Sequence, residues 1–165
     1  MKILGIDTSL RSSGYGIIQV NGNKVRAVDC GVIKNKAKLT QLQCLHRISS
    51  AITQLIQLYK PDHVAIEGAF FHRNAKTAMI LGMARGAALA ATAAFEVPTY
   101  EYAPKKAKAA VTGSGNASKE QVAFMMAQIL KVDISQINDD ATDALALCYC
   151  HYNATKFGLT EKNRL

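Results

Sequence analysis

The sequence lacks the paired cysteines and clustered histidines of a metal-binding or redox motif. Its four cysteines are Cys30, Cys44, Cys148 and Cys150, and none of them forms a C-x-x-C pair or has a histidine cluster beside it. Cys148 and Cys150 lie in an apolar helical stretch, where buried free thiols are expected. This pattern predicts reduced thiols and a cytoplasmic protein.

The sequence also has little that would direct it to a membrane. Its N-terminus shows no basic region followed by an apolar leader and a cleavage site. The longest apolar stretch, residues 78–95, contains Arg85 and many alanines, so we expect no membrane span. Internal repeats, low-complexity tracts and linkers are lacking as well. We therefore expect one domain over residues 1–154, followed by a disordered polar tail at residues 155–165.

Positive charge, in contrast, is abundant. The 165 residues include 20 Lys and Arg against 12 Asp and Glu, which gives a net charge of +8. A basic protein that gathers its carboxylates in a few places suggests a polyanionic substrate and a local metal site. Charge alone leaves open a merely basic soluble protein.

Apolar runs and turn signals predict an α/β fold. The turn Asn21-Gly22-Asn23 predicts a hairpin, and the first three strands then form an antiparallel meander. Two later strands joined by helical crossovers would be parallel, giving a mixed five-stranded sheet flanked by helices. We expect strands at residues 2–7, 14–20, 24–33, 63–67 and 97–102, a polar turn at 9–13, and helices at 39–59, 74–95, 104–111, 118–130 and 139–153.

Four carboxylates at the edges of apolar runs are the most informative feature of the chain. Asp7 and Glu67 each end such a run, and Asp140 and Asp143 open a third one. Because an unpaired charge is costly to bury, these acids need a partner. Mg²⁺ fits, since it typically takes a few carboxylates together with substrate phosphates.

The four acids converge if the strands at 2–7 and 63–67 are parallel neighbours. Ligand sites form outside the carboxyl ends of such strands, and acids three residues apart share one helix face. Without metal the cluster would repel itself, whereas two bridged cations would activate water and stabilise the leaving oxygen of a phosphodiester. Each acid also has a structural alternative. Asp139 could be the helix cap, and the pair Asp139 and Asp143 is geometrically possible.

Two further segments predict contacts with nucleic acid. The turn Gly113-Ser114-Gly115 is flanked by lysines, a plausible phosphate contact, although a solvated basic surface is the alternative. Phe70 and Phe71 follow Glu67 closely, and one of them could stack on a splayed base or pack into the core. The candidate DNA-contacting residues are Phe70, Arg73, Lys105, Lys108 and Lys119.

Small residues recur at spacings of three and four in the helix expected from residue 74. They are Ala75, Ala78, Gly82 and Gly86. Such a face lets a second helix approach closely. That helix is either internal or the same helix of a second subunit about a two-fold axis.

The motifs together resemble the RuvC family of bacterial Holliday-junction resolvases over nearly the whole chain. The matching segments are Gly5-Ile6-Asp7 with Gly14-Tyr15-Gly16, Ala65-Ile66-Glu67, Leu81-Gly82-x-Ala84-Arg85-Gly86 and the run from Asp140 to Ala146. Their order and separations make the resemblance specific.

The resemblance implies an RNase H-like fold and a homodimer that nicks four-way DNA junctions symmetrically, with Mg²⁺ or Mn²⁺ and some sequence preference. It places the catalytic, metal-binding acids on Asp7, Glu67, Asp140 and Asp143, and prefers Asp140 to Asp139. The junction-probing aromatic falls on Phe70, and DNA-contacting lysines fall on Lys108 and Lys119. The branch-migration complex RuvA–RuvB is implied as a partner.

One departure concerns the turn after Asp7, where the family usually has Pro-Gly and this chain has Thr8-Ser9. We expect the missing glycine to change that turn. Two other functions remain open: another RNase H-like nuclease, such as an RNA–DNA hybrid nuclease or a resolvase-like protein, and a non-catalytic junction-binding module.

Overall fold

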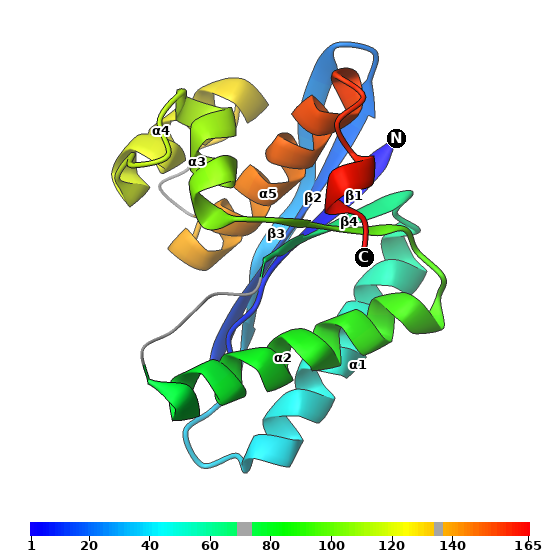
Figure 1. The fold of residues 1–165 in the computed structure, drawn as a ribbon, viewed down its shortest axis with the longest axis vertical. Helices are drawn as coiled ribbons and strands as arrows, with labels where there is room; N and C mark the ends of the chain where they lie inside the picture. The colour runs from blue at the N-terminus through cyan, green and yellow to red at the C-terminus, as the bar shows by residue number, and fades with distance from the viewer. Residues whose placement is uncertain (69–73, 134–136) are drawn as a thin grey trace.

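A mixed five-stranded sheet forms the centre of the protein (Figure 1). The structure, a computed structural model, describes residues 1–68, 74–133 and 137–165. The strand order is β3-β2-β1-β4-β5. β1 pairs with β2 and β2 with β3 in antiparallel fashion, while β1, β4 and β5 are parallel. The strands are β1 (Lys2–Asp7), β2 (Ser12–Asn21), β3 (Lys24–Lys34), β4 (His63–Glu67) and β5 (Thr99–Tyr102).

Helices cover both faces of this sheet, so the predicted α/β architecture is confirmed (Figure 1). Two helices pack on one face with a core that includes Leu4, Ile6 and Ile17, and three pack on the other with a core that includes Ile3 and Ile18. The first pair is α1 (Gln41–Tyr59) and α2 (Ala75–Ala94); the second group is α3 (Pro104–Thr112), α4 (Lys119–Leu130) and α5 (Asp139–Lys156).

The sheet register brings the first two acids together. Ile6 pairs with Ile66 in the parallel β1–β4 ladder, so Asp7 and Glu67 are the last residues of adjacent strands. The conditional prediction that these strands are parallel neighbours is therefore confirmed.

Glycines on β1 and β2 let α5 lie unusually close to the sheet. A Cβ atom on Gly5 would lie 2.0 Å from the Ala144 carbonyl oxygen, and one on Gly14 would lie 1.9 Å from the Asp140 carbonyl oxygen. Neither distance is physically possible, so any side chain here would push the helix away. The lack of side chains at Gly5 and Gly14 thus sets how near the first turn of α5 comes to Asp7.

Two expectations about segment ends are wrong. The expected polar turn at 9–13 is shorter, because Ser12 and Ser13 already pair with β3 as the start of β2. The expected disordered tail is ordered: α5 continues to Lys156, a 3-10 helix η2 spans Glu161–Asn163, and Arg164 pairs with Tyr100. The tail gains order because the Leu165 amide donates to the Thr99 carbonyl oxygen on the outer edge of β5, at 2.9 Å.

α2 has the length and apolarity of a membrane-spanning helix. Length and composition alone are weak evidence for a membrane span, because the core helix of a soluble protein meets the same criteria. Its Ala84, Ala88 and Ala91 are buried in the core shared with α1 and the sheet. Its Arg85 forms an ion pair with Glu101 of β5, so one side of α2 is committed to the fold.

Candidate active site

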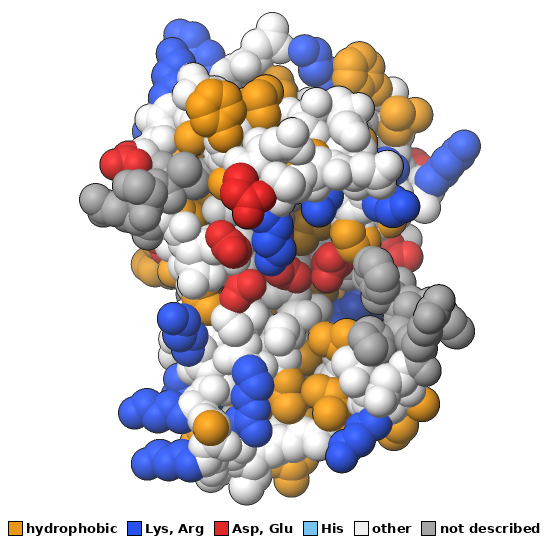
Figure 2. Space-filling model, turned by 90° about the vertical axis from the view of Figure 1, so that its left-hand side faces the viewer, with side chains coloured by type: hydrophobic (Ala, Val, Ile, Leu, Met, Phe, Trp, Pro, Cys, Tyr) orange, Lys and Arg blue, Asp and Glu red, His pale blue; other side chains and the backbone are white. Residues whose placement is uncertain are grey.

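Three of the four predicted acids line one cleft at the carboxyl ends of β1 and β4. The cleft has a volume of about 340 Å³. Figure 2 shows its surroundings, with acidic side chains gathered around a basic side chain in the middle of one face. Charged residues on its wall are Asp7, Glu67, Asp143, Lys108 and Lys119, and the remaining wall is Pro104, Ala107, Val122, Ala146 and Leu147.

Mutual repulsion and burial dominate the electrostatics of this cleft. Burial, followed by the charges of Glu67 and Asp143, raises the pKa of Asp7 from 3.8 to about 8. The pKa values of Glu67 and Asp143 are also raised, in each case mainly by burial. Asp7 therefore holds a proton near neutral pH in the absence of a cation, and its carboxyl hydrogen-bonds to Glu67. The cleft therefore concentrates carboxylates, of which Asp143 has a lysine partner in Lys119.

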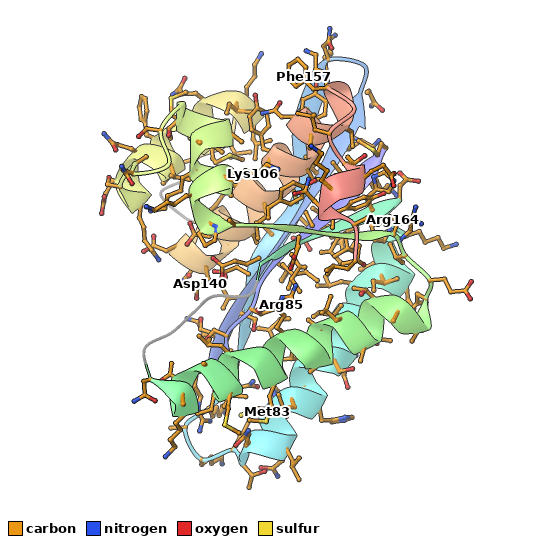
Figure 3. The ribbon with its side chains drawn as sticks, viewed as in Figure 1. Met83, Arg85, Lys106, Asp140, Phe157 and Arg164 are labelled. Carbon is orange, nitrogen blue, oxygen red and sulfur yellow. The ribbon has the colours of Figure 1, made fainter. Side chains whose placement is uncertain are left out.

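Asp140 lies beside this cleft rather than in its wall, at the first turn of α5 (Figure 3). Its carboxylate accepts a hydrogen bond from the Ser12 hydroxyl at the start of β2. It also contributes to raising the pKa of both Asp7 and Asp143, so it is electrostatically part of the same cluster.

The ambiguity about Asp139 is reduced by the cap of α5. The cap is Asn138, whose side-chain oxygen accepts from the Asp140 amide at 3.0 Å, and not Asp139 as one alternative had it. Asp139 is exposed and does not line the cleft. The geometry therefore favours Asp140 over Asp139.

Two of the predicted lysines face the acids. Lys119, at the start of α4, lies 3.5 Å from the Asp143 carboxylate, and its side chain is 55% exposed. Lys108 of α3 donates to the Ala117 carbonyl oxygen at 2.9 Å and so ties α3 to the turn before α4. Lys105, in contrast, is exposed and outside the cleft wall.

Arg85 is a residue that sequence reasoning did not single out for the site. It extends from α2 toward the end of the sheet (Figure 3), where its Nε donates to the Glu67 carbonyl oxygen at 3.1 Å. Its guanidinium also pairs with Glu101 at 2.6 Å. Because Arg85 joins the ends of β4 and β5, it holds the backbone of a candidate catalytic acid. A lone charge within the apolar stretch 78–95 was the available signal.

The turn after Asp7 accommodates Thr8-Ser9 without strain. Neither residue has a positive φ, so no glycine is required there. The Ser9 amide donates to the Ser13 hydroxyl at 3.0 Å, and that hydroxyl donates to the Ser9 carbonyl oxygen at 2.6 Å. Serine hydrogen bonds thus close the loop that the family's Pro-Gly pair would otherwise form.

Two predicted DNA contacts, Phe70 and Arg73, lie outside the described residues. Within the described ranges, no group of three or more His, Cys, Asp or Glu side chains has the geometry of a complete metal site.

A mixed sheet with acids at the ends of two parallel strands and at the start of a helix across the sheet defines a nuclease of the RNase H-like class. Comparison with known proteins narrows this class. A family model for crossover junction endodeoxyribonuclease RuvC matches residues 3–151. The chain therefore belongs to the RuvC family.

Individual relatives agree with this assignment. Crossover junction endodeoxyribonuclease RuvC of Alkaliphilus metalliredigens is 43% identical over 95% of this chain and 96% of its own. The RuvC of Cytophaga hutchinsonii is 45% identical over 91% of this chain and 75% of its own. The structure of T. thermophilus RuvC in complex with a Holliday junction substrate superposes with a TM-score of 0.92, at 31% identity over 100% of this chain and 99% of that one.

Proposed function

We propose that the protein resolves four-way (Holliday) DNA junctions by metal-dependent hydrolysis of phosphodiester bonds, in DNA recombination and repair. The observation that carries the proposal is the meeting of Asp7, Glu67 and Asp143 in one cleft with Lys108 and Lys119. Acids alone would repel a phosphate, and lysines alone would only bind one. Their combination is suited to binding a phosphodiester and cutting it.

The donor set fits divalent cations, with Mg²⁺ as our proposal and Mn²⁺ as a substitute, two at each site. Carboxylates are the hard oxygen ligands that Mg²⁺ takes, and it completes its coordination with water and substrate phosphates. The pKa of Asp7 is raised by burial and then by the neighbouring carboxylates, and a bound cation would favour the charged form. When bound, such ions supply an activated water and stabilise the leaving oxygen. Asp7, Glu67, Asp140 and Asp143 would hold them.

The protein's own groups then orient the substrate. Lys119 and Lys108 contact phosphate oxygens near the acids, and Lys105 extends the basic surface of α3 toward the glycine turn, since Gly115 packs against its backbone. Phe70 and Arg73 belong to the proposal by resemblance only. Ser12 and Arg85 hold Asp140 and the end of β4 in place.

We also propose that two copies act together through α2. Met79, Gly82, Met83 and Gly86 lie on the exposed side of this helix, and a Cβ on Gly82 would meet nothing within 4 Å. This apolar side is free to pack on the same helix of a second copy, which would put two sites on two like strands of a junction. By resemblance, the RuvA–RuvB complex is a further partner, and the cytoplasm is the expected location.

A variant pair tests the assignment of the acids. Asp140→Asn should abolish nicking of a synthetic four-way junction in Mg²⁺, while Asp139→Asn, a change of the same charge one residue away, should nick at the wild-type rate. Loss of activity in Asp139→Asn alone would exchange the roles of the two residues. Wild-type nicking in chelator would refute metal dependence.

Competing substrates test the two alternatives. Faster cleavage of an RNA–DNA hybrid than of the junction would favour a hybrid nuclease. Tight junction binding without metal-dependent cleavage on any substrate would favour a binding module. The four intact acids argue against the second outcome.

A further inference from the structure

The segment between β1 and the turn before β4 is almost free of negative charge. Residues 8–61 contain eight Lys and Arg residues and a single acid, Asp29. Asp29 accepts hydrogen bonds from the hydroxyls of Tyr59, at 2.7 Å, and Tyr15, at 3.3 Å. It lies five residues before the end of β3, which is about 17 Å along the strand. Within residues 8–61, the end of β3 therefore carries positive charge without an acid beside it in the sequence.

Five of these basic residues gather at the end of the sheet that carries the acids; we term them the basic rim. They are Arg11, Lys34, Lys36, Lys38 and Arg47. Lys34 pairs in the sheet with Ser12, whose hydroxyl donates to Asp140. Since neighbouring strands are about 4.8 Å apart, the backbone of Lys34 lies two strands, or about 10 Å, from that of β1. In the view of Figure 2, basic side chains also lie on the lower part of the face, below the group of acidic side chains.

The basic rim is held by its own hydrogen bonds. Asn35 is buried, and its amide donates to the Leu10 carbonyl oxygen at 2.8 Å. Arg11 donates to the Lys36 carbonyl oxygen at 3.0 Å, and Arg47 donates to the Asn35 side-chain oxygen at 3.0 Å. The two arginines thus brace the loop between β3 and α1, and the lysines project from a fixed backbone.

The three lysines are exposed and available. Lys34, Lys36 and Lys38 are exposed, and among the described residues none of them forms an ion pair with a carboxylate. The adjoining N-terminus of α1, capped by Thr40, has no acid in its first turn, so the helix dipole adds to the positive potential. Exposed cations on a fixed loop beside an acidic cleft are suited to a polyanion that passes from one to the other.

We propose that the basic rim binds the phosphates of one duplex arm of the junction, beside the acidic cleft. This inference rests on the proposed function. A duplex carries about one charge per 1.7 Å of its axis, so an arm leaving the cleft over β2 and β3 would present several phosphates to the three lysines. The rim holds the arm while the acids act on the strand at the crossover.

The test is junction binding by Lys34→Ala/Lys36→Ala/Lys38→Ala, measured in chelator so that no strand is cut. The matched control is Lys24→Ala/Lys156→Ala/Lys162→Ala, which removes the same charge from three exposed lysines away from the acids. The rim variant should reduce the magnitude of the negative slope of log K against log salt by about 2–3, since each lost contact contributes about 0.9. The control should keep the wild-type slope. Melting curves establish that both variants are folded.

A second measurement locates the contact on the DNA. Methylphosphonate linkages in the arm, next to the crossover, remove the charges that the rim would bind. Wild type should lose affinity for this junction, and the rim variant should lose much less. A rim variant with the wild-type slope, or an equal loss in both proteins, overturns the inference and would leave an acidic protein as the partner of the rim. Wild-type cleavage of the unmodified junction, measured in Mg²⁺, separates that outcome from failure of the proposed function.

Discussion

Removing the charge of Asp7 should stabilise the metal-free protein. The carboxyl is largely buried among Glu67, Asp143 and Asp140, and its pKa is raised to about 8. In the variant Asp7→Asn, the amide keeps the shape and can donate to Glu67 as the protonated acid does. The variant should therefore keep the fold and lose the cost of burying a carboxyl group beside other carboxylates.

The magnitude follows from the linkage between ionisation and folding. A raised acid pKa means that the unfolded state ionises first, so the destabilisation grows as pH rises from 3.8 to about 8 and is constant above that. A pH of 7 lies about three units above the pKa of Asp7 in the unfolded state, which corresponds to a destabilisation of the fold by about 4 kcal/mol. For a chain of this size, that is a rise in Tm of roughly 8–16 °C.

The assay is four melting curves, for wild type and Asp7→Asn, each in chelator and in millimolar Mg²⁺. In chelator the variant should melt above wild type. In Mg²⁺ wild type should gain stability by mass action, about 2.7 kcal/mol at one hundred times Kd, and the variant should gain less. Asp139→Asn, an exposed carboxylate outside the cleft, should leave both curves unchanged. A variant that melts well below wild type in chelator would make Asp7 a structural hydrogen-bond acceptor and contradict its assignment as a metal ligand.

Four further outcomes are expected. Lys108→Ala and Lys119→Ala should each reduce the magnitude of the salt slope of junction binding by about 0.9, and an unchanged slope in both would remove them from the interface. Gly82→Leu should leave the chain folded, because a Cβ there meets nothing within 4 Å in the same chain, but should yield monomers by sedimentation; a wild-type protein that sediments as a monomer would contradict the dimer. Gly5→Ala should destabilise the protein by about 1–3 kcal/mol and reduce nicking, because α5 must move away from the sheet; wild-type stability would refute the close approach. His151, whose pKa is lowered to about 3 by burial and then by His63, is neutral in the fold, so its own contribution to the free energy of unfolding should be lost as the pH falls from 6.5 to about 3, opposite in sign to the contribution of Asp7. In denaturant titrations, His151→Gln should show a smaller loss over that range.

The fold could be predicted because its local signals are strong. The Asn21-Gly22-Asn23 turn specifies the meander, and the apolar runs that end in Asp7 and Glu67 specify two buried strands whose parallel pairing the structure confirms. The sequence determines the ends of elements less well: the polarity of Ser12 and Ser13 favours a turn, yet β3 pairs with both. Polar residues extend a strand when the neighbouring strand supplies the hydrogen bonds.

Residues that position the site were missed because their partners are distant in sequence. Ser12 and Asp140 are 128 positions apart, and no local pattern links a serine in an expected turn to the start of the last helix. Arg85 reaches the Glu67 carbonyl oxygen only because α2 crosses the end of β4. The tail was expected to be disordered because its residues are polar, whereas its order comes from backbone bonds to the edge of β5, which polarity does not encode.

The most direct test of the account is the cleavage pattern on a synthetic four-way junction whose four strands carry different labels. In Mg²⁺, wild-type protein should nick two like strands at symmetric positions and release two nicked duplexes, with no products in chelator or from Asp7→Asn. Products from all four strands at random, from linear duplex at the same rate, or from the junction in chelator would contradict it.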